Sequence, residues 1–297
     1  MDENNNEYRL REVRCPTGFS WSNLKAELKA VWESNVKDWK IEFAYPVSFI
    51  RQMISPLVFL LPFLFYGLVL VGGTYSPELE QLVGTGDVVG YIFTGYMLMG
   101  FIGTAVWAMG FSIRQESWFG TLEAIYVTPS SRLGQVMGMA IHSTIHQIAG
   151  TLLQLVVIYL TFGLALKVEG ILPALGIFAL MMLALYGFGI VISALGLILK
   201  EGWVVSDSLY SIMMILSPVA YPLLVLPTVA QQASALFPTA PALIGMRTFL
   251  LENYRPEAFG NVFLHLLVLG AAWILFGVVV FRLTDRYVRK RGLLKKF

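Results

Sequence analysis

Residues 52–77 read QMISPLVFLLPFLFYGLVLVGGTYSP, a run without a single aspartate, glutamate, lysine or arginine. A helix needs about 20 apolar residues to cross a hydrocarbon core roughly 30 Å thick, and a charged side chain at the centre of that core is costly. A barrel strand would instead alternate polar and apolar residues over about 10 positions. The run therefore predicts a membrane-spanning helix.

The rest of the chain repeats this pattern, with charge-free intervals at residues 88–113, 133–166, 170–199, 208–246 and 258–281. The 297-residue sequence is 57% hydrophobic and only 13% charged, which is about half the charged share of a soluble domain. Its mean hydropathy is +0.69. We predict an all-α integral membrane protein with six transmembrane helices, placed at about 54–73, 88–112, 135–163, 171–199, 206–226 and 260–281.

The transmembrane domain is expected to occupy residues 51–283, between a cytoplasmic N-terminal segment (1–50) and a basic cytoplasmic tail (284–297). The interval 208–246 is too long for one simple span, and prolines interrupt it. Prolines free backbone carbonyl groups, which at membrane depth must be sheltered by protein or water. We therefore expect an outer re-entrant helical hairpin between the fifth and sixth spans, marked by Pro218, Pro222, Pro227 and Pro238.

The distribution of lysine and arginine predicts the orientation, because cytoplasmic loops carry an excess of both. With both termini inside (N-in/C-in), the cytoplasmic segments hold 18 of the 21 basic residues. The outer loops then hold only Lys167, Arg247 and Arg255. We predict a multi-pass protein of the cytoplasmic (inner) membrane, with its basic tail against anionic lipid headgroups.

Residues 21–43 have the pattern of an amphipathic helix. Apolar side chains recur three or four positions apart, and lysines and glutamates occupy the opposite face. Tryptophans on the apolar face suit the headgroup level of a membrane. We predict an interfacial helix that could gate lateral entry of a substrate. Simple anchoring, or a helix of a small soluble domain, explains the same pattern. The candidate gate residues are Trp21, Trp32 and Trp39.

The connection between the second and third spans, residues 114–132, carries a second helical signal. Gly120 interrupts the helical run, and Thr121 can then cap a new short helix with Glu123 in its first turn. Pro129 ends this helix, because the residue before a proline leaves the helical region. We predict a short amphipathic cytoplasmic helix that can dock into a groove on a soluble partner.

This connection resembles the cytoplasmic coupling segment of the membrane subunits of type-2 ABC exporters. In that family an acid precedes Gly-Thr-Leu-Glu, and a later Thr-Pro is followed by a basic residue. The proline-rich outer segment is also similar to the family's fifth span and hairpin, although the family often has glycine where Pro218 stands. The resemblance implies that coupling to an ATPase involves Glu116, Gly120, Thr121, Leu122, Glu123, Thr128, Pro129 and Arg132.

The resemblance also implies the division of labour. The chain would be the channel-forming permease subunit of an ATP-binding cassette exporter and not itself an enzyme. It would pair with a second permease subunit, as a homodimer, and with two copies of a separate ATPase. The sequence contains no Gly-x-x-x-x-Gly-Lys-Ser/Thr phosphate loop, so we expect ATP and Mg²⁺ on the partner and no cofactor in this chain. Membrane lipids are expected partners, and nucleic acid is not.

The predicted spans contain almost no ionisable side chains. Carriers driven by protons or sodium usually place such groups in the bilayer. This favours ATP as the energy source and an amphipathic drug, a glycan or a lipid-linked glycan as the cargo. Aromatic side chains could line its path, and the candidates are Phe59, Phe63, Tyr66, Tyr96, Phe101 and Trp107.

Two further features leave alternatives open. His142 and His146 are four residues apart on the third span, but no carboxylate or cysteine is close in sequence to complete a metal site. We therefore interpret them as packing residues and predict no metal. The competing functions are an intramembrane lipid-modifying enzyme, which would need a carboxylate or histidine cluster near one interface, and a non-transporting membrane assembly factor.

Overall fold

The computed structural model describes residues 21–118, 120, 132–164, 166–199, 202–251, 253 and 261–291, and these residues are mostly helical. They contain no β-strand, apart from an isolated bridge between Tyr75 and Asp87. The elements in chain order are α1 (Trp21–Ala44), α2 (Pro46–Val71), α3 (Pro77–Val83), α4 (Val88–Gly103), the π-helix η1 (Thr104–Met109), α5 (Gly110–Trp118), α7 (Arg132–Phe162), η2 (Val168–Gly170), α8 (Ile171–Gly196), α9 (Gly202–Leu216), η3 (Leu223–Val225), α10 (Thr228–Ser234), α11 (Thr239–Leu250) and α12 (Val262–Arg291).

Five helical segments of the described chain are long and apolar enough to cross a membrane. They lie where the first, second, third, fourth and sixth spans are predicted, and the second runs without a break through α4, η1 and α5. Their bounds are Pro46–Val71, Val88–Glu116, Arg132–Phe162, Val168–Gly196 and Val262–Val288. The charge-free runs therefore predicted these five helices correctly.

The predicted fifth span, residues 206–226, is not one helix. α9 ends at Leu216, and its apolar part is shorter than the other five segments. Pro218 stops the helix, because proline has no amide hydrogen to donate and pushes the preceding residue out of the helical region. The chain then forms the short helices η3, α10 and α11. The count of six spans and the re-entrant placement of these short helices stay predictions.

α8 and α12 pack closely together, and glycine makes their closest approach possible. A Cβ atom on Gly187 would lie 2.4 Å from the backbone nitrogen of Ile274, and one on Gly277 would lie 2.5 Å from the carbonyl oxygen of Gly187. Small residues at such crossings let helix backbones touch. Gly187 therefore permits the close contact between the backbones of α8 and α12.

The buried core and the outward apolar surface belong to different helices. The largest buried cluster joins α4, η1, α8 and α11, with members such as Leu98, Met181 and Leu243. α2, in contrast, turns most of its large apolar side chains outward, among them Phe59 and Tyr66. An exposed apolar face that runs along a whole helix is typical of a surface that meets lipid or another subunit.

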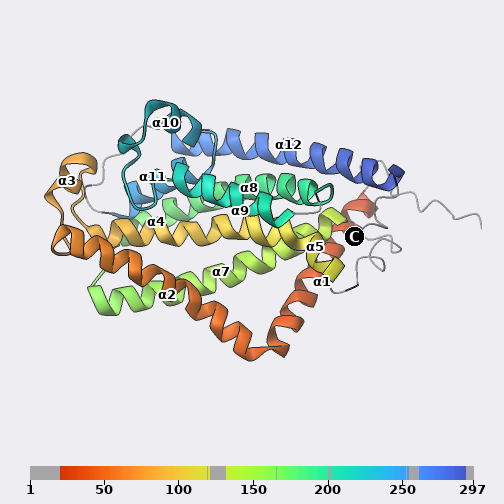
Figure 1. Ribbon diagram of the computed structural model, residues 1–297, viewed down its shortest axis with the longest axis horizontal. Helices are drawn as coiled ribbons and strands as arrows, with labels where there is room; N and C mark the ends of the chain where they lie inside the picture. Colours follow the sequence, from red (N-terminus) through yellow and green to blue (C-terminus); the bar gives the residue numbers. More distant parts are fainter. Residues whose placement is uncertain are drawn as a thin grey trace, which may run out of the picture.

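The bundle has two distinct ends (Figure 1). α3, α10 and α11 gather at one, which we call the α11 end. α1, α5 and the last turns of α12 gather at the other, which we call the α5 end. α1 meets α2 in a V-shaped bend and packs along α7. The N-terminal helix therefore lies against the start of the third span.

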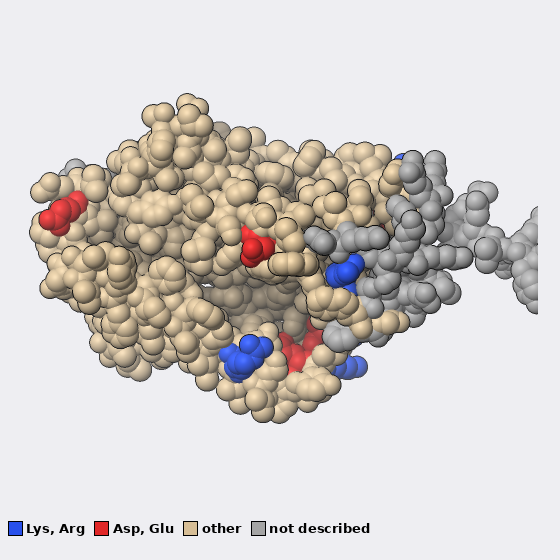
Figure 2. Space-filling model, in the orientation of Figure 1, with Lys and Arg blue, Asp and Glu red and all other residues tan. Residues whose placement is uncertain are grey.

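The face drawn in Figure 2 is mostly uncharged, as expected of helices in a bilayer. Most of its visible charged side chains lie toward the α5 end, around α1, and acids also lie over α3 and α9. The same face is hollowed between the body of the bundle and the V formed by α1 and α2. The polar groups of the candidate site lie at the α5 end.

Candidate functional site

The second span leads into the connection that the sequence analysis singles out. α5 ends at Trp118, and Gly120 has a φ of 69°, a left-handed value that glycine adopts readily and that commonly follows a helix. Glu116 lies in the last turn of α5, and Arg132 begins α7. The other predicted coupling residues lie outside the described residues: Thr121, Leu122, Glu123, Thr128 and Pro129.

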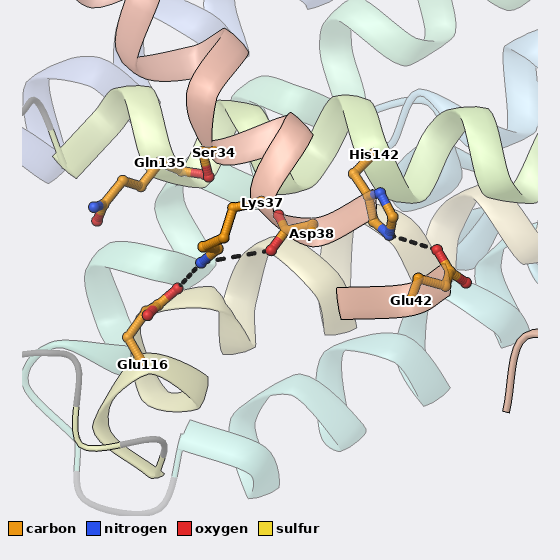
Figure 3. A network of polar contacts seen from close by, with 7 residues as sticks. All are labelled: Ser34, Lys37, Asp38, Glu42, Glu116, Gln135 and His142. Atoms are coloured by element: carbon orange, nitrogen blue, oxygen red, sulfur yellow. Dashed lines mark hydrogen bonds and ion pairs between the residues drawn. The ribbon is translucent and has the colours of Figure 1, made fainter. Parts of the chain in front are cut away.

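A polar pocket lies where α1, α5 and α7 meet, beside the last turn of α5. Figure 3 shows the Lys37 side chain reaching from α1 between the carboxylates of Asp38 and Glu116. The predicted coupling residues Glu116 and Arg132 both line this pocket, together with residues of the N-terminal helix. Its polar lining includes Ser34, Lys37, Asp38, Glu116, Arg132 and Gln135.

Lys37 links α1 to α5 electrostatically. Its Nζ donates a hydrogen bond to Oε1 of Glu116 and lies 3.5 Å from Oδ1 of Asp38. Burial of the ammonium group acts to lower the pKa of Lys37, but the two carboxylates outweigh it and raise that pKa. Burial also raises the pKa of Asp38, against the opposing effect of Lys37. Lys37 is therefore positively charged at neutral pH and binds the carboxylate of Glu116 on α5.

Arg132 links the start of α7 to α12. Its Nη1 donates a hydrogen bond to Oδ1 of Asp285 at 2.5 Å, and its side chain is only 6% exposed. A charged group this buried needs an opposite charge beside it. The two predicted coupling residues that flank the connection thus face different helices, with Glu116 bound to the first and Arg132 to the last.

The two histidines of α7 face a carboxylate that their sequence spacing does not reveal. Nε2 of His142 lies 2.9 Å from Oε2 of Glu42, and Nε2 of His146 lies 2.9 Å from Oε1 of the same residue. The ring of Trp39 packs edge-on against His142, with the centroids 4.6 Å apart. The interpretation as packing residues therefore missed an ionisable partner. Still, no group of three or more His, Cys, Asp and Glu side chains in the described ranges is arranged to hold a metal ion.

Arg247, at the α11 end, is another residue whose role the sequence analysis missed. The charge pattern assigns it to an outer loop, but it lies within α11 and is completely buried. Its Nε donates to Oγ1 of Thr94 at 3.2 Å, and its guanidinium carbon lies 3.4 Å above the ring of Tyr91. Its terminal nitrogens donate to three backbone carbonyl oxygens at 2.7 Å each, those of Tyr91, Pro218 and Val219. Arg247 therefore fastens α11 to α4 and to the break after α9.

The six aromatic candidates for a substrate path do not share one surface. Phe63 packs against Tyr96, with ring centroids 5.7 Å apart. Phe101 is buried in the core against Phe178. The candidates with exposed side chains are Phe59, Phe63, Tyr66 and Trp107.

The candidate gate tryptophans also differ in exposure and in what they contact. Trp32 is 66% exposed, whereas Trp39 stacks on Phe43 and contacts His142. The side chain of Trp21 is outside the described part of the chain. Of the three, only Trp39 is therefore observed in contact with the third span.

The four prolines of the predicted hairpin stand at helix boundaries. Pro222, Pro227 and Pro238 directly precede η3, α10 and α11, and Pro218 lies just beyond α9. Proline suits the entry to a helix, because its fixed φ is helical and its missing amide hydrogen would be unpaired there anyway. The prolines therefore set where the short helices begin.

The model of a protein family described as "ABC-2 type transporter" matches residues 27–251. No curated protein matches the sequence. The matched region runs from α1 to α11 and includes both sides of the polar pocket.

Proposed function

The chain belongs to the ABC-2 type transporter family, and we propose that it forms the channel of an exporter for an amphipathic or lipid-linked molecule, either a glycan or a drug-like compound. Membership makes it a permease subunit of an ABC transporter, a multi-pass membrane protein that works with an ATPase partner. The family match carries the proposal, because it covers most of the chain, including the segments that flank the connection after α5.

In the proposed orientation the α5 end faces the cytoplasm and both termini lie on that side of the inner membrane. Two observations support it. Most lysines and arginines fall in segments that this orientation leaves inside. The beginning of α1 and the end of α12 also lie at the same end of the bundle as α5 (Figure 1).

The proposed assembly has two copies of this chain and two ATPase subunits. ATP and Mg²⁺ would be bound by the ATPase, because the sequence lacks the phosphate-binding loop. The exposed apolar face of α2 is one surface that lipid or the second permease could cover. The hollow beside the V of α1 and α2 supports lateral entry of the substrate from the membrane (Figure 2).

We propose that the ATPase moves the connection 119–131. The ion pairs that flank this connection would transmit the movement to α1 and α12. A displacement of the last turn of α5 would reach α1 through Glu116 and Lys37. A displacement of the start of α7 would reach α12 through Arg132 and Asp285. The partner can shift the channel between two states only if it binds them unequally, so these contacts are expected to differ between the states.

The competing functions fit less well. An intramembrane enzyme needs an ionisable cluster, and Glu42 with the two histidines is such a cluster. The family, however, is one of transporter permeases. A non-transporting assembly factor would have no need of an ATPase.

Replacing Glu123 by arginine tests the ATPase contact. We expect recovery of the ATPase with the affinity-purified permease to fall at least about tenfold, because reversing a charge in a docking helix opposes the complementary charge of the groove. Glu169→Arg, at the other end of the bundle on exposed η2, makes the same chemical change and should leave recovery unchanged. Full ATPase recovery and undiminished ATP-driven transport in Glu123→Arg would show that the coupling assignment is wrong.

Reversing the charge of Lys37 tests the link between α5 and α1. Lys37→Glu sets three carboxylates side by side. The pair is partly exposed and is worth about 1 kcal/mol, so we expect permease-dependent ATP hydrolysis in nanodiscs to fall about fivefold while the ATPase stays bound. The double variant Lys37→Glu/Glu116→Lys should recover most of the rate, and Lys29→Glu on the exposed face of α1 should behave like wild type. A double variant no better than the single one would contradict the proposed link.

A further inference from the structure

Glu42, His142 and His146 form a buried ionisable cluster that the coupling contacts do not use. Their side chains are 8%, 11% and 14% exposed. Each ring Nε2 lies 2.9 Å from a different oxygen of one carboxylate, so Glu42 sits between the two rings. Figure 3 shows Glu42 reaching His142 from the end of α1. The cluster therefore joins the last turns of the N-terminal helix to the third span.

The groups around Glu42 include no positive partner in the described chain other than the two histidines. From its own helix, Asp38 adds a negative charge. From α2, the uncharged ring of Phe49 packs against His146, with the two ring centroids 5.8 Å apart. Lys37 is engaged by Glu116 and Asp38. A fully ionised Glu42 between neutral histidines would therefore leave one net negative charge buried between the helices.

Hydrogen bonding does not compensate for that charge. Oε2 of Glu42 and Nε2 of His146 are buried without a hydrogen-bond partner, although both lie at contact distance from the opposite group. A buried carboxylate with an unsatisfied oxygen is costly, whereas the neutral form is tolerated. Burial, and next the charge of Asp38, raise the pKa of Glu42. Each of these observations favours a cluster that holds one extra proton.

We infer that Glu42, His142 and His146 form a proton-binding site that fastens the end of α1 to the third span, with one proton shared by the three groups. With the proton the cluster is neutral, whether the proton rests on the carboxyl group or on a ring. Without it the cluster is an anion between two packed helices. The site is distinct from the Lys37 contact, which lies one turn earlier on α1 and binds α5.

The sign of the pH dependence follows from linkage. Glu42 binds its proton more tightly when α1 is docked than when it is free, so docking takes up a proton. The stabilisation is complete below the ordinary pKa of a carboxyl group and is lost as the pH rises through the raised value. The end of α1 should therefore loosen as the cytoplasmic face becomes alkaline.

Hydrogen exchange of the full-length protein in nanodiscs tests this inference. We expect the amides of residues 36–44 to lose at least about tenfold protection between about pH 6 and about pH 9, after correction for intrinsic exchange. Glu42→Gln is neutral at every pH and nearly the same size, so its protection should not vary. Glu33→Gln makes the same change on the exposed side of α1 and should behave like wild type. Equal pH dependence in Glu42→Gln and wild type would overturn the proposal.

A second measurement reports on the carboxyl group of Glu42 directly. In infrared spectra, the carbonyl band of protonated carboxyl groups grows as the pH falls, and the difference between wild type and Glu42→Gln should contain the contribution of one carboxyl group that is already protonated at a higher pH than an ordinary one. Zinc provides the competing explanation, since two imidazoles and a carboxylate are also metal ligands. We expect neither a chelator nor added Zn²⁺ to change the protection of residues 36–44. Protection lost with chelator and restored by Zn²⁺ would replace the proton by a metal ion.

Discussion

Replacing Arg247 by methionine should lower the free energy of unfolding by at least about 3 kcal/mol. The guanidinium group is the hydrogen-bond donor to the carbonyl oxygens of Tyr91, Pro218 and Val219. Methionine fills similar space but donates nothing, so the buried carbonyls of Pro218 and Val219 lose this donor, at about 1–3 kcal/mol for each one left unsatisfied, whereas the carbonyl of Tyr91 still accepts from the hydroxyl group of Thr94. Thermal unfolding in detergent micelles, followed by intrinsic fluorescence, measures the loss.

Two variants show whether the lower stability of Arg247→Met comes from the missing guanidinium hydrogen-bond donors or from the missing positive charge. Arg247→Lys keeps the charge, but one ammonium group cannot match the planar set of donors, so it should lie between wild type and Arg247→Met. Arg282→Met removes an exposed arginine from α12 and should change the unfolding temperature little. If Arg247→Met unfolded at the same temperature as Arg282→Met, the buried arginine would not be what ties α11 to α4.

Replacing Gly187 by alanine should destabilise the protein by about 1–3 kcal/mol, through the smallest side-chain addition possible. The new methyl group would lie 2.4 Å from backbone atoms of α12 at Trp273 and Ile274. Backbone atoms cannot rotate aside as a flexible side chain can, so α8 and α12 must separate at their crossing. Denaturant titration in mixed micelles, or the unfolding temperature, measures the effect.

Gly270→Ala is the matched control on the same interface. A Cβ atom on Gly270 meets its nearest neighbour, Leu183, at 3.5 Å, an ordinary van der Waals contact. This variant should be neutral or slightly more stable, because alanine favours the helix over glycine by about 1 kcal/mol. Equal stability of Gly187→Ala and Gly270→Ala would mean that the helices do not touch at Gly187.

Helices were the most predictable feature, because the cost of burying charge acts on each residue wherever it lies in the chain. Runs such as 52–77 and 170–199 therefore marked α2 and α8 without knowledge of any neighbour. The prediction of one continuous helix over residues 206–226 was wrong, because composition and backbone chemistry disagree there. The residues around Pro218 are apolar enough for a span, but proline ends α9 at Leu216.

The site was predictable only in part. The motif around Gly120 predicts a coupling segment after α5, most of which lies outside the described residues, and the structure describes only Glu116, Gly120 and Arg132 of the predicted coupling residues. Their ion-pair partners, Lys37 and Asp285, lie on the first and last helices, and no sequence periodicity links them. The spacing of His142 and His146 was interpreted as helix packing, and nothing in it pointed to Glu42.

Composition, charge bias and one short motif thus suffice to assign this chain to a class of helical membrane permeases, because each is a property of contiguous residues. They do not identify the partner of a buried ionisable group. The partner depends on which helices meet and how closely they approach. Examples are the contact of Gly187 with the backbone of α12 and the hydrogen bond from Arg247 to the chain just after α9. Arg247 illustrates the difference: the charge pattern of the chain assigns it to an outer loop, whereas packing buries it completely among backbone carbonyls.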